Sequence, residues 1–148
     1  MEKELKKKIK EEGDFLQGEF LGLPFVLWRH DGFGHWCGYV GVPKGSRLNG
    51  KDYYISTESE NGLSKIEEAI NNIEVHGGLT FAGTLSHREV KDGLWYFGFD
   101  CGHCNDLEPF IFEKYPSMEH GIYRDKEYVI GECKSLAKQL KNIIDLKL

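Results

Sequence analysis

One stretch of the chain joins an aromatic, apolar segment directly to a cluster of reactive side chains. Residues 95–99 are Trp-Tyr-Phe-Gly-Phe, and residues 100–106 are Asp-Cys-Gly-His-Cys-Asn-Asp. A continuous apolar run of this length is typical of a strand that is buried on both faces. The sequence therefore predicts a strand over residues 94–100 that presents polar side chains where it ends.

Two further segments combine histidine and glycine with apolar residues. Residues 29–39 are Arg-His-Asp-Gly-Phe-Gly-His-Trp-Cys-Gly-Tyr, and residues 75–80 are Val-His-Gly-Gly-Leu-Thr. Each segment lies at the expected end of a strand, so we expect all three to meet in one shared site. The two glycines after His76 would let the backbone curl around a ligand, although a β-bulge explains them equally well.

Hydrophobic patterning predicts an α+β fold. Strands are expected over residues 20–30 and 35–42, joined as a β-hairpin by Asp31-Gly32, and over residues 73–82 and 94–100. A peripheral helix is expected over residues 1–12. A second helix should follow the capping box of Ser64 and Glu67, and a third is expected over residues 125–146. The 148 residues should form a single α+β domain, an antiparallel sheet of about four to five strands packed by two or three helices.

Composition restricts the classes of function. A net charge of −5 argues against a protein that holds extended nucleic acid by neutralising phosphates. No run approaches the roughly 18 apolar residues of a membrane span, so no membrane partner is expected. The four cysteines do not form a secreted disulfide framework, so we expect reduced thiols and a cytoplasmic protein.

The Cys-x-x-Cys motif at 101–104 allows two kinds of thiol chemistry. Thiol–disulfide exchange needs a helix that continues after the second cysteine, whereas the Asn-Asp-Leu-Glu-Pro that follows favours a loop. A structural zinc ion could be held by Cys101 and Cys104 together with His35 and Cys37. The single residue between His35 and Cys37 is shorter than the usual spacing, which weakens the zinc interpretation.

Acid–base chemistry is the other alternative. Asp100, His103 and Asp106 follow one another at three-residue steps, and His76 is expected on a neighbouring strand. Such a set could act as acid and base or could hold a hard divalent ion. An aspartate at a strand end is often only a turn former, however. No cofactor is firmly implied, a divalent metal stays open, and no residue is assigned as a metal ligand.

Three motifs resemble those of an uncharacterised family of small phage- and prophage-encoded proteins. They are Gly-Tyr-Val-Gly-Val-Pro at 38–43, His-Gly-Gly-Leu-Thr-Phe at 76–81 and Gly-Phe-Asp-Cys-x-His-x-x-Asp at 98–106. The resemblance covers residues 35–140. It implies that Cys101, His103 and Asp106 belong to the family's motif, whereas the position of Cys104 is commonly a small residue. Phage provenance also implies roles such as countering host defences that signal with small nucleotides.

Together these observations predict an anti-defence accessory protein that binds and sequesters a small nucleotide-derived ligand in the host cytosol. The alternative is a hydrolase of a phosphoester or glycosidic bond in a nucleotide, with His76, Asp100 and His103 as catalytic residues. Whether the protein is an enzyme is left open, as are a homo-oligomer and inhibition of a host protein by surface contact. The expected ligand-binding residues are His35, Trp36, His76, Gly77, Gly78, Asp100, Cys101, His103, Asp106 and Arg124.

Overall fold

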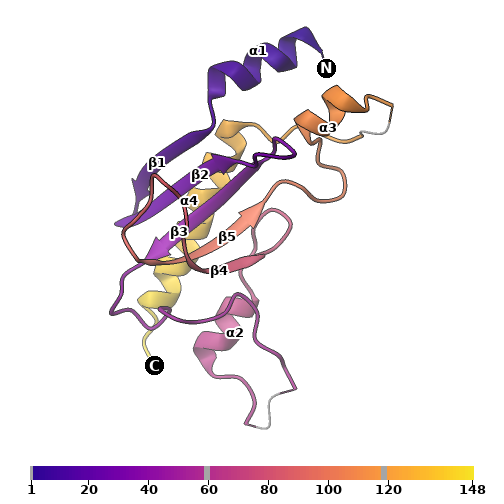
Figure 1. Ribbon diagram of the computed structural model, residues 1–148. Coiled ribbons are helices and arrows are strands. Elements are labelled where there is room, and N and C mark those ends of the chain that lie inside the picture. The colour runs from indigo at the N-terminus through magenta and orange to yellow at the C-terminus, as the bar shows by residue number, and fades with distance from the viewer. Residues whose placement is uncertain (1, 59–60, 118–119) are drawn as a thin grey trace.

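The computed structural model describes residues 2–58, 61–117 and 120–148 (Figure 1). In chain order its elements are α1 (Lys3–Glu12), β1 (Phe15–Phe20), β2 (Leu23–Arg29), β3 (Trp36–Val42), α2 (Lys65–Asn71), β4 (Phe81–Thr84), β5 (Trp95–Asp100), α3 (Pro109–Lys114) and α4 (Lys126–Ile144). The strands form one antiparallel sheet in the order β1-β2-β3-β5-β4. This confirms the predicted α+β class and strand number, with four described helices instead of two or three.

One face of the sheet packs against α4 and forms the main core. Side chains alternate along β3 and β5, so Val40, Phe97 and Phe99 point towards this helix. Helix α4 lies within the helix predicted over residues 125–146, and its face towards the sheet is apolar and buried, with Val129, Cys133, Leu136, Leu140 and Ile143. Asp125 caps the helix by accepting a hydrogen bond from the backbone N–H of Tyr128.

The opposite face of the sheet carries a smaller, aromatic cluster. Val26 and Tyr96 are buried beneath Val90 of the segment that joins β4 to β5. Around them lie half-buried aromatic rings, among them Trp28, Tyr39 and Phe81. Residues 96–99 are therefore buried, as a strand that is covered on both faces requires.

The predicted strand over 73–82 is wrong for most of its length. Gly77 and Gly78 both have a positive φ, of 68° and 79°, which lies outside the β region of a regular strand. The N–H of Gly78 donates to the carbonyl of Val75 and closes a turn. Only Phe81 and Ala82 of the predicted segment join β4, which continues to Thr84.

Two elements were not predicted from the sequence. Leu21 and Gly22, with φ of 53° and 79°, make a tight turn that separates β1 from β2. The sequence pattern hid this turn, because apolar residues continue on both sides of it. Helix α3 begins at Pro109, a residue that suits the first position of a helix because the missing N–H has no partner there anyway.

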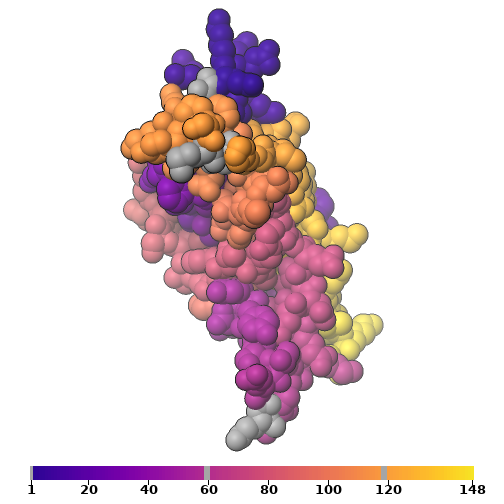
Figure 2. All heavy atoms as spheres, turned by 90° about the vertical axis from the view of Figure 1, so that its right-hand side faces the viewer, coloured from indigo at the N-terminus to yellow at the C-terminus, as the bar shows by residue number. Residues whose placement is uncertain are grey.

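The ends of the molecule are formed by different helices. Helix α1 lies at one end, and α2 lies towards the other (Figures 1 and 2). The capping box of Ser64 and Glu67 is confirmed at the start of α2. None of the described helices is long and apolar enough to cross a membrane.

Glycine 38 permits the close approach of β3, β5 and α4. A Cβ atom there would lie 2.6 Å from the Phe99 ring and 2.9 Å from Cys133 Sγ. We expect Gly38→Ala to lower the free energy of unfolding by about 1–3 kcal/mol, because a packed core resists added volume. Gly45→Ala is the matched control, since its Cβ would meet nothing within 4 Å. Urea denaturation tests this expectation, and equal midpoints for the two variants would contradict it.

Candidate functional site

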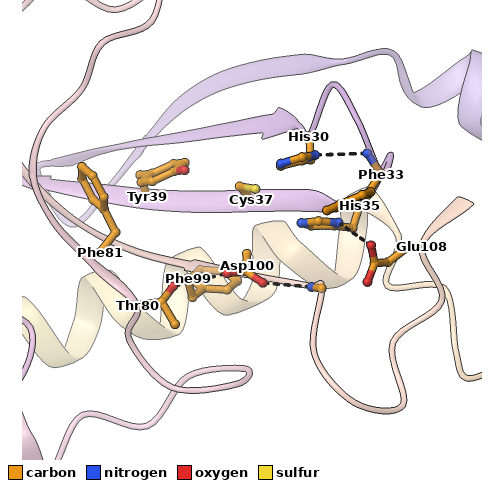
Figure 3. A pocket seen from close by; sticks show the side chains of 11 residues that line it. His30, Phe33, His35, Cys37, Tyr39, Thr80, Phe81, Phe99, Asp100 and Glu108 are labelled. Atoms are coloured by element: carbon orange, nitrogen blue, oxygen red, sulfur yellow. Dashed lines mark hydrogen bonds and ion pairs between the residues drawn. The ribbon is translucent and has the colours of Figure 1, made fainter. Parts of the chain in front are cut away.

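A pocket of about 420 Å³ opens on the aromatic face of the sheet, where β3 begins and β5 ends (Figure 3). Its size lies in the range of small-molecule sites. Figure 3 shows the imidazoles of His30 and His35 at one end and the rings of Tyr39 and Phe81 at the other. The residues that line the pocket are His30, Phe33, His35, Cys37, Tyr39, Thr80, Phe81, Phe99, Asp100, Gly102 and Glu108.

His30 has a fixed tautomer. Its Nδ1 accepts hydrogen bonds from the backbone N–H groups of Gly32 and Phe33, both at 3.1 Å. A nitrogen that accepts cannot carry a proton, so Nε2 holds the hydrogen of this ring. The ring stacks on Phe33 and on His35, with centroids 4.9 Å apart in both pairs. His30 therefore offers an N–H donor at the pocket.

His35 is buried without a hydrogen-bond partner for Nδ1. Its side chain is 8% exposed, and among the described residues no group bonds this nitrogen, since Glu108 Oε2 is 3.7 Å away. Burial, and then the neighbouring His30, lower the pKa of His35 below its ordinary value, so the ring is neutral near pH 7. The ring cannot easily move, because it lies against Gly102, where a Cβ would come within 2.8 Å.

Asp100 forms the polar floor of the pocket at the end of β5. Its Oδ1 accepts a hydrogen bond from the backbone N–H of Gly102 at 2.9 Å, and its Oδ2 accepts one from the Thr80 hydroxyl at 3.4 Å. His103 Nε2 lies 3.2 Å from Oδ1. Burial, and then the charge of Asp100, raise the pKa of Cys37 to about 12, so this cysteine stays a thiol and is a poor nucleophile.

A second polar cluster lies beside the pocket and is centred on Asp106. This carboxylate is 1% exposed and accepts hydrogen bonds from His76 Nε2 at 2.7 Å, Arg124 Nε at 2.9 Å and the backbone N–H of His103 at 3.1 Å. His76 Nδ1 is paired with the Tyr128 hydroxyl at 2.8 Å. Because both nitrogens of His76 have protein partners, this cluster is built to hold the three chain segments together.

The ionisation of Asp106 reflects these partners. Burial disfavours the charged form, but the hydrogen bonds from His76, Arg124 and the backbone of His103 outweigh it and hold the pKa below its ordinary value. The cluster also reaches the pocket through His103, whose ring lies 6.3 Å from that of His76 and contacts Asp100.

The structure brings most of the predicted site residues together. His76, Asp106, His103 and Arg124 form the Asp106 cluster, and the space at Gly77 is filled by the His103 ring. Asp100 and His35 line the pocket instead. The predicted shared site therefore has two adjacent parts, joined by the contact between Asp100 and His103.

Three predicted ligand-binding residues lie elsewhere. Trp36 is fully buried beneath the Arg29 guanidinium, 4.5 Å from the ring centre, and Cys101 is 1% exposed in the core. Gly78 lines a separate depression beside Tyr53 and Tyr54. We therefore leave these three residues out of the proposed site.

Sequence reasoning missed several residues of the pocket. Cys37, Tyr39 and Phe81 point to the same face as Asp100, because paired strands keep one register. The alternation along residues 35–42 contained this signal, but reading it required the pairing of β3 with β5. Phe33 lies within the 29–39 segment, whose pattern does not show that this side chain faces the site, and Glu108 comes from a loop that carries no pattern.

The thiol and metal interpretations find no geometric support. Within the described ranges, no group of three or more His, Cys, Asp or Glu side chains could hold a metal ion. Cys101 is buried whereas Cys104 is exposed, and both are free thiols.

Comparisons with protein-family models, curated proteins and solved structures find no match to this chain.

Proposed function

We propose that the protein binds and retains a small nucleotide-derived ligand in the pocket between His30, His35 and Asp100. The observation that carries this proposal is the buried His35, whose Nδ1 has no hydrogen-bond partner among the described residues. A buried polar atom without a partner costs about 1–3 kcal/mol, so such atoms are few in a folded protein. A ligand atom within reach of His35 would remove this cost.

The walls of the pocket suit a planar, polar group. Tyr39 and Phe81 meet edge to face with centroids 5.4 Å apart, and Phe33 is 44% exposed. Aromatic rings of this kind can stack on any of the nucleic-acid bases, because every base has a flat π-face. The phosphate groups of a nucleotide would lie outside, because Asp100 and Glu108 would repel them from the interior.

We propose sequestration as the biological role, and this part of the proposal comes from the resemblance to phage and prophage proteins. A protein that removes a signalling nucleotide from the host cytosol needs tight binding and no turnover. The thiol of Cys37 fits this requirement, since its raised pKa makes it unreactive.

Mass spectrometry tests binding and turnover together. The protein is mixed with guanine and adenine nucleosides, cyclic dinucleotides and ADP-ribose derivatives, removed by filtration, and heated to release what it held. We expect one compound to leave the filtrate and to return unaltered after heating. Gly102→Ala should reduce its capture at least tenfold, because the added methyl displaces His35, whereas Gly45→Ala should not. The absence of any depletion would contradict the proposal.

A hydrolase is the second candidate, and the contact between His103 and Asp100 favours it. The His103 side chain is 34% exposed, and its buried Nε2 lies 3.2 Å from a carboxylate that lines the pocket. An imidazole so placed could move a proton to or from a bound substrate. In the same experiment a hydrolase would return a compound of new mass, and His103→Gln would abolish the conversion.

A further inference from the structure

We infer that the ligand carries a guanine-type base and that Asp100 recognises its donor edge. This inference rests on the proposed function and specifies the chemical class of the ligand. The pocket has two carboxylates, Asp100 and Glu108, and neither lysine nor arginine among its described lining residues. Such a lining selects groups that donate hydrogen bonds.

The carboxylate of Asp100 is held in a fixed orientation with acceptor capacity left over. Gly102 N–H binds one oxygen and the Thr80 hydroxyl binds the other. Each carboxylate oxygen accepts about two hydrogen bonds, so both oxygens can accept one more. His103 Nε2 approaches Oδ1 to 3.2 Å but makes no hydrogen bond there. The side chain of Asp100 is 32% exposed, which leaves it accessible from the pocket.

A guanine edge matches two adjacent acceptors. Its N1–H and its exocyclic N2–H₂ are neighbouring donors that point in one direction, so a carboxylate can accept from both at once. The corresponding edge of adenine has a donor at N6 and an acceptor at N1. That acceptor would face a carboxylate oxygen. Adenine would therefore be repelled by Asp100 and would also lack one of the two hydrogen bonds that guanine donates.

The remaining groups of guanine find partners of the right kind. Its O6 and N7 are acceptors, and His30 offers an N–H donor because its Nδ1 is occupied by the Gly32 and Phe33 amides. Figure 3 shows His30 and Asp100 on opposite sides of Cys37, and all three line the pocket, so a base bound over Cys37 would face both. Tyr39 and Phe81 close the end of this space with apolar surface.

Isothermal titration calorimetry with three nucleosides tests the inference. Guanosine has both donors, inosine lacks the N2 amine, and adenosine presents the mismatched edge. We expect guanosine to bind most tightly, inosine about tenfold more weakly and adenosine about a hundredfold more weakly. Adenosine binding as tightly as guanosine would overturn the guanine assignment while the proposed function stood. If neither the nucleosides nor the wider panel of compounds bound, the proposed function itself would fail.

Variants of Asp100 separate recognition from folding. Asp100→Asn replaces one acceptor by a donor, so we expect guanosine affinity to fall about a hundredfold while adenosine affinity is unchanged or rises. Asp100→Glu keeps the charge but moves it by one methylene group. This variant should reduce the ratio of guanosine affinity to adenosine affinity. Glu19→Gln, on the same face of the sheet and exposed, is the matched control. A variant that melts like the wild type and keeps the wild-type ranking of nucleosides would contradict the inference.

Discussion

Replacement of Arg29 by methionine is expected to lower the free energy of unfolding by about 4 kcal/mol, since it removes one partner of a buried ion pair. The Arg29 side chain is 2% exposed, and its guanidinium lies 3.5 Å from Glu12. Its nitrogens also donate to the carbonyls of Gly13 and Gly34, at 2.9 Å and 2.8 Å. Without the guanidinium the two carbonyls lose this donor, and the Glu12 carboxylate keeps only the hydrogen bonds from the Tyr123 hydroxyl and the backbone N–H of Lys126.

Arg29→Lys serves as the variant that should still fold. An ammonium group cannot reproduce the planar fork of guanidinium, so we expect a loss of about 2 kcal/mol. Hydrogen exchange should show that α1 loses protection first, because Arg29 joins the residues that end this helix to β2. Arg88→Lys, on a side chain that is 89% exposed, should change the stability by less than about 0.5 kcal/mol. Equal unfolding midpoints for the two lysine variants would contradict this account of Arg29.

Asp106→Asn is expected to destabilise the protein by about 3 kcal/mol at pH 7, because it leaves the donors of His76 and Arg124 without a carboxylate. The loss should depend on pH. The pKa of Asp106 is lowered in the folded protein, so its contribution is present above the pKa of the unfolded chain, about 3.9. It is lost as the pH falls through the folded pKa. Urea denaturation between pH 7 and pH 2.5 should therefore show the wild type and the variant converging.

The control for this prediction is an exposed aspartate. Asp145 pairs with Lys141 at 3.4 Å, and its side chain is 59% exposed. Asp145→Asn should change the stability by less than about 0.5 kcal/mol at any pH in this range. A stability gap between Asp106→Asn and the wild type that is constant from pH 7 to pH 2.5 would show that the carboxylate is not the stabilising group.

The elements that the sequence predicted well are those with strong local signals. Ser64 with Glu67, and Asp125, mark helix starts by side-chain chemistry that needs no tertiary contact. The run over residues 95–99 is apolar on both faces, and only a covered strand tolerates this. Errors arose where backbone conformation decides, as at Gly77 and Gly78, because the pattern of side chains does not report a positive φ.

The candidate site was predictable only in part. His76, His103 and Asp106 could be grouped because each is a polar residue next to an apolar strand or glycine turn, and they do meet. Which of these residues serve structure and which face a cavity depends on distances of a few ångströms. The Asp106 carboxylate is bound by His76 and Arg124, whereas Nδ1 of His35 has no hydrogen-bond partner among the described residues. The spacing of residues along the sequence does not encode this difference.

An NMR titration shows residue by residue whether a small ligand binds in the pocket of His35 and Asp100. Amide signals of the ¹⁵N-labelled protein are followed as guanosine is added. We predict saturable shifts confined to the residues that line the pocket, among them His30, His35, Asp100 and Gly102, and to their neighbours in the chain. Signals of Gly62 and Gly131, which lie in other parts of the chain, should not move. Shifts that cluster around Tyr128 and Arg124, or saturable binding that leaves the pocket signals unchanged, would contradict the claim.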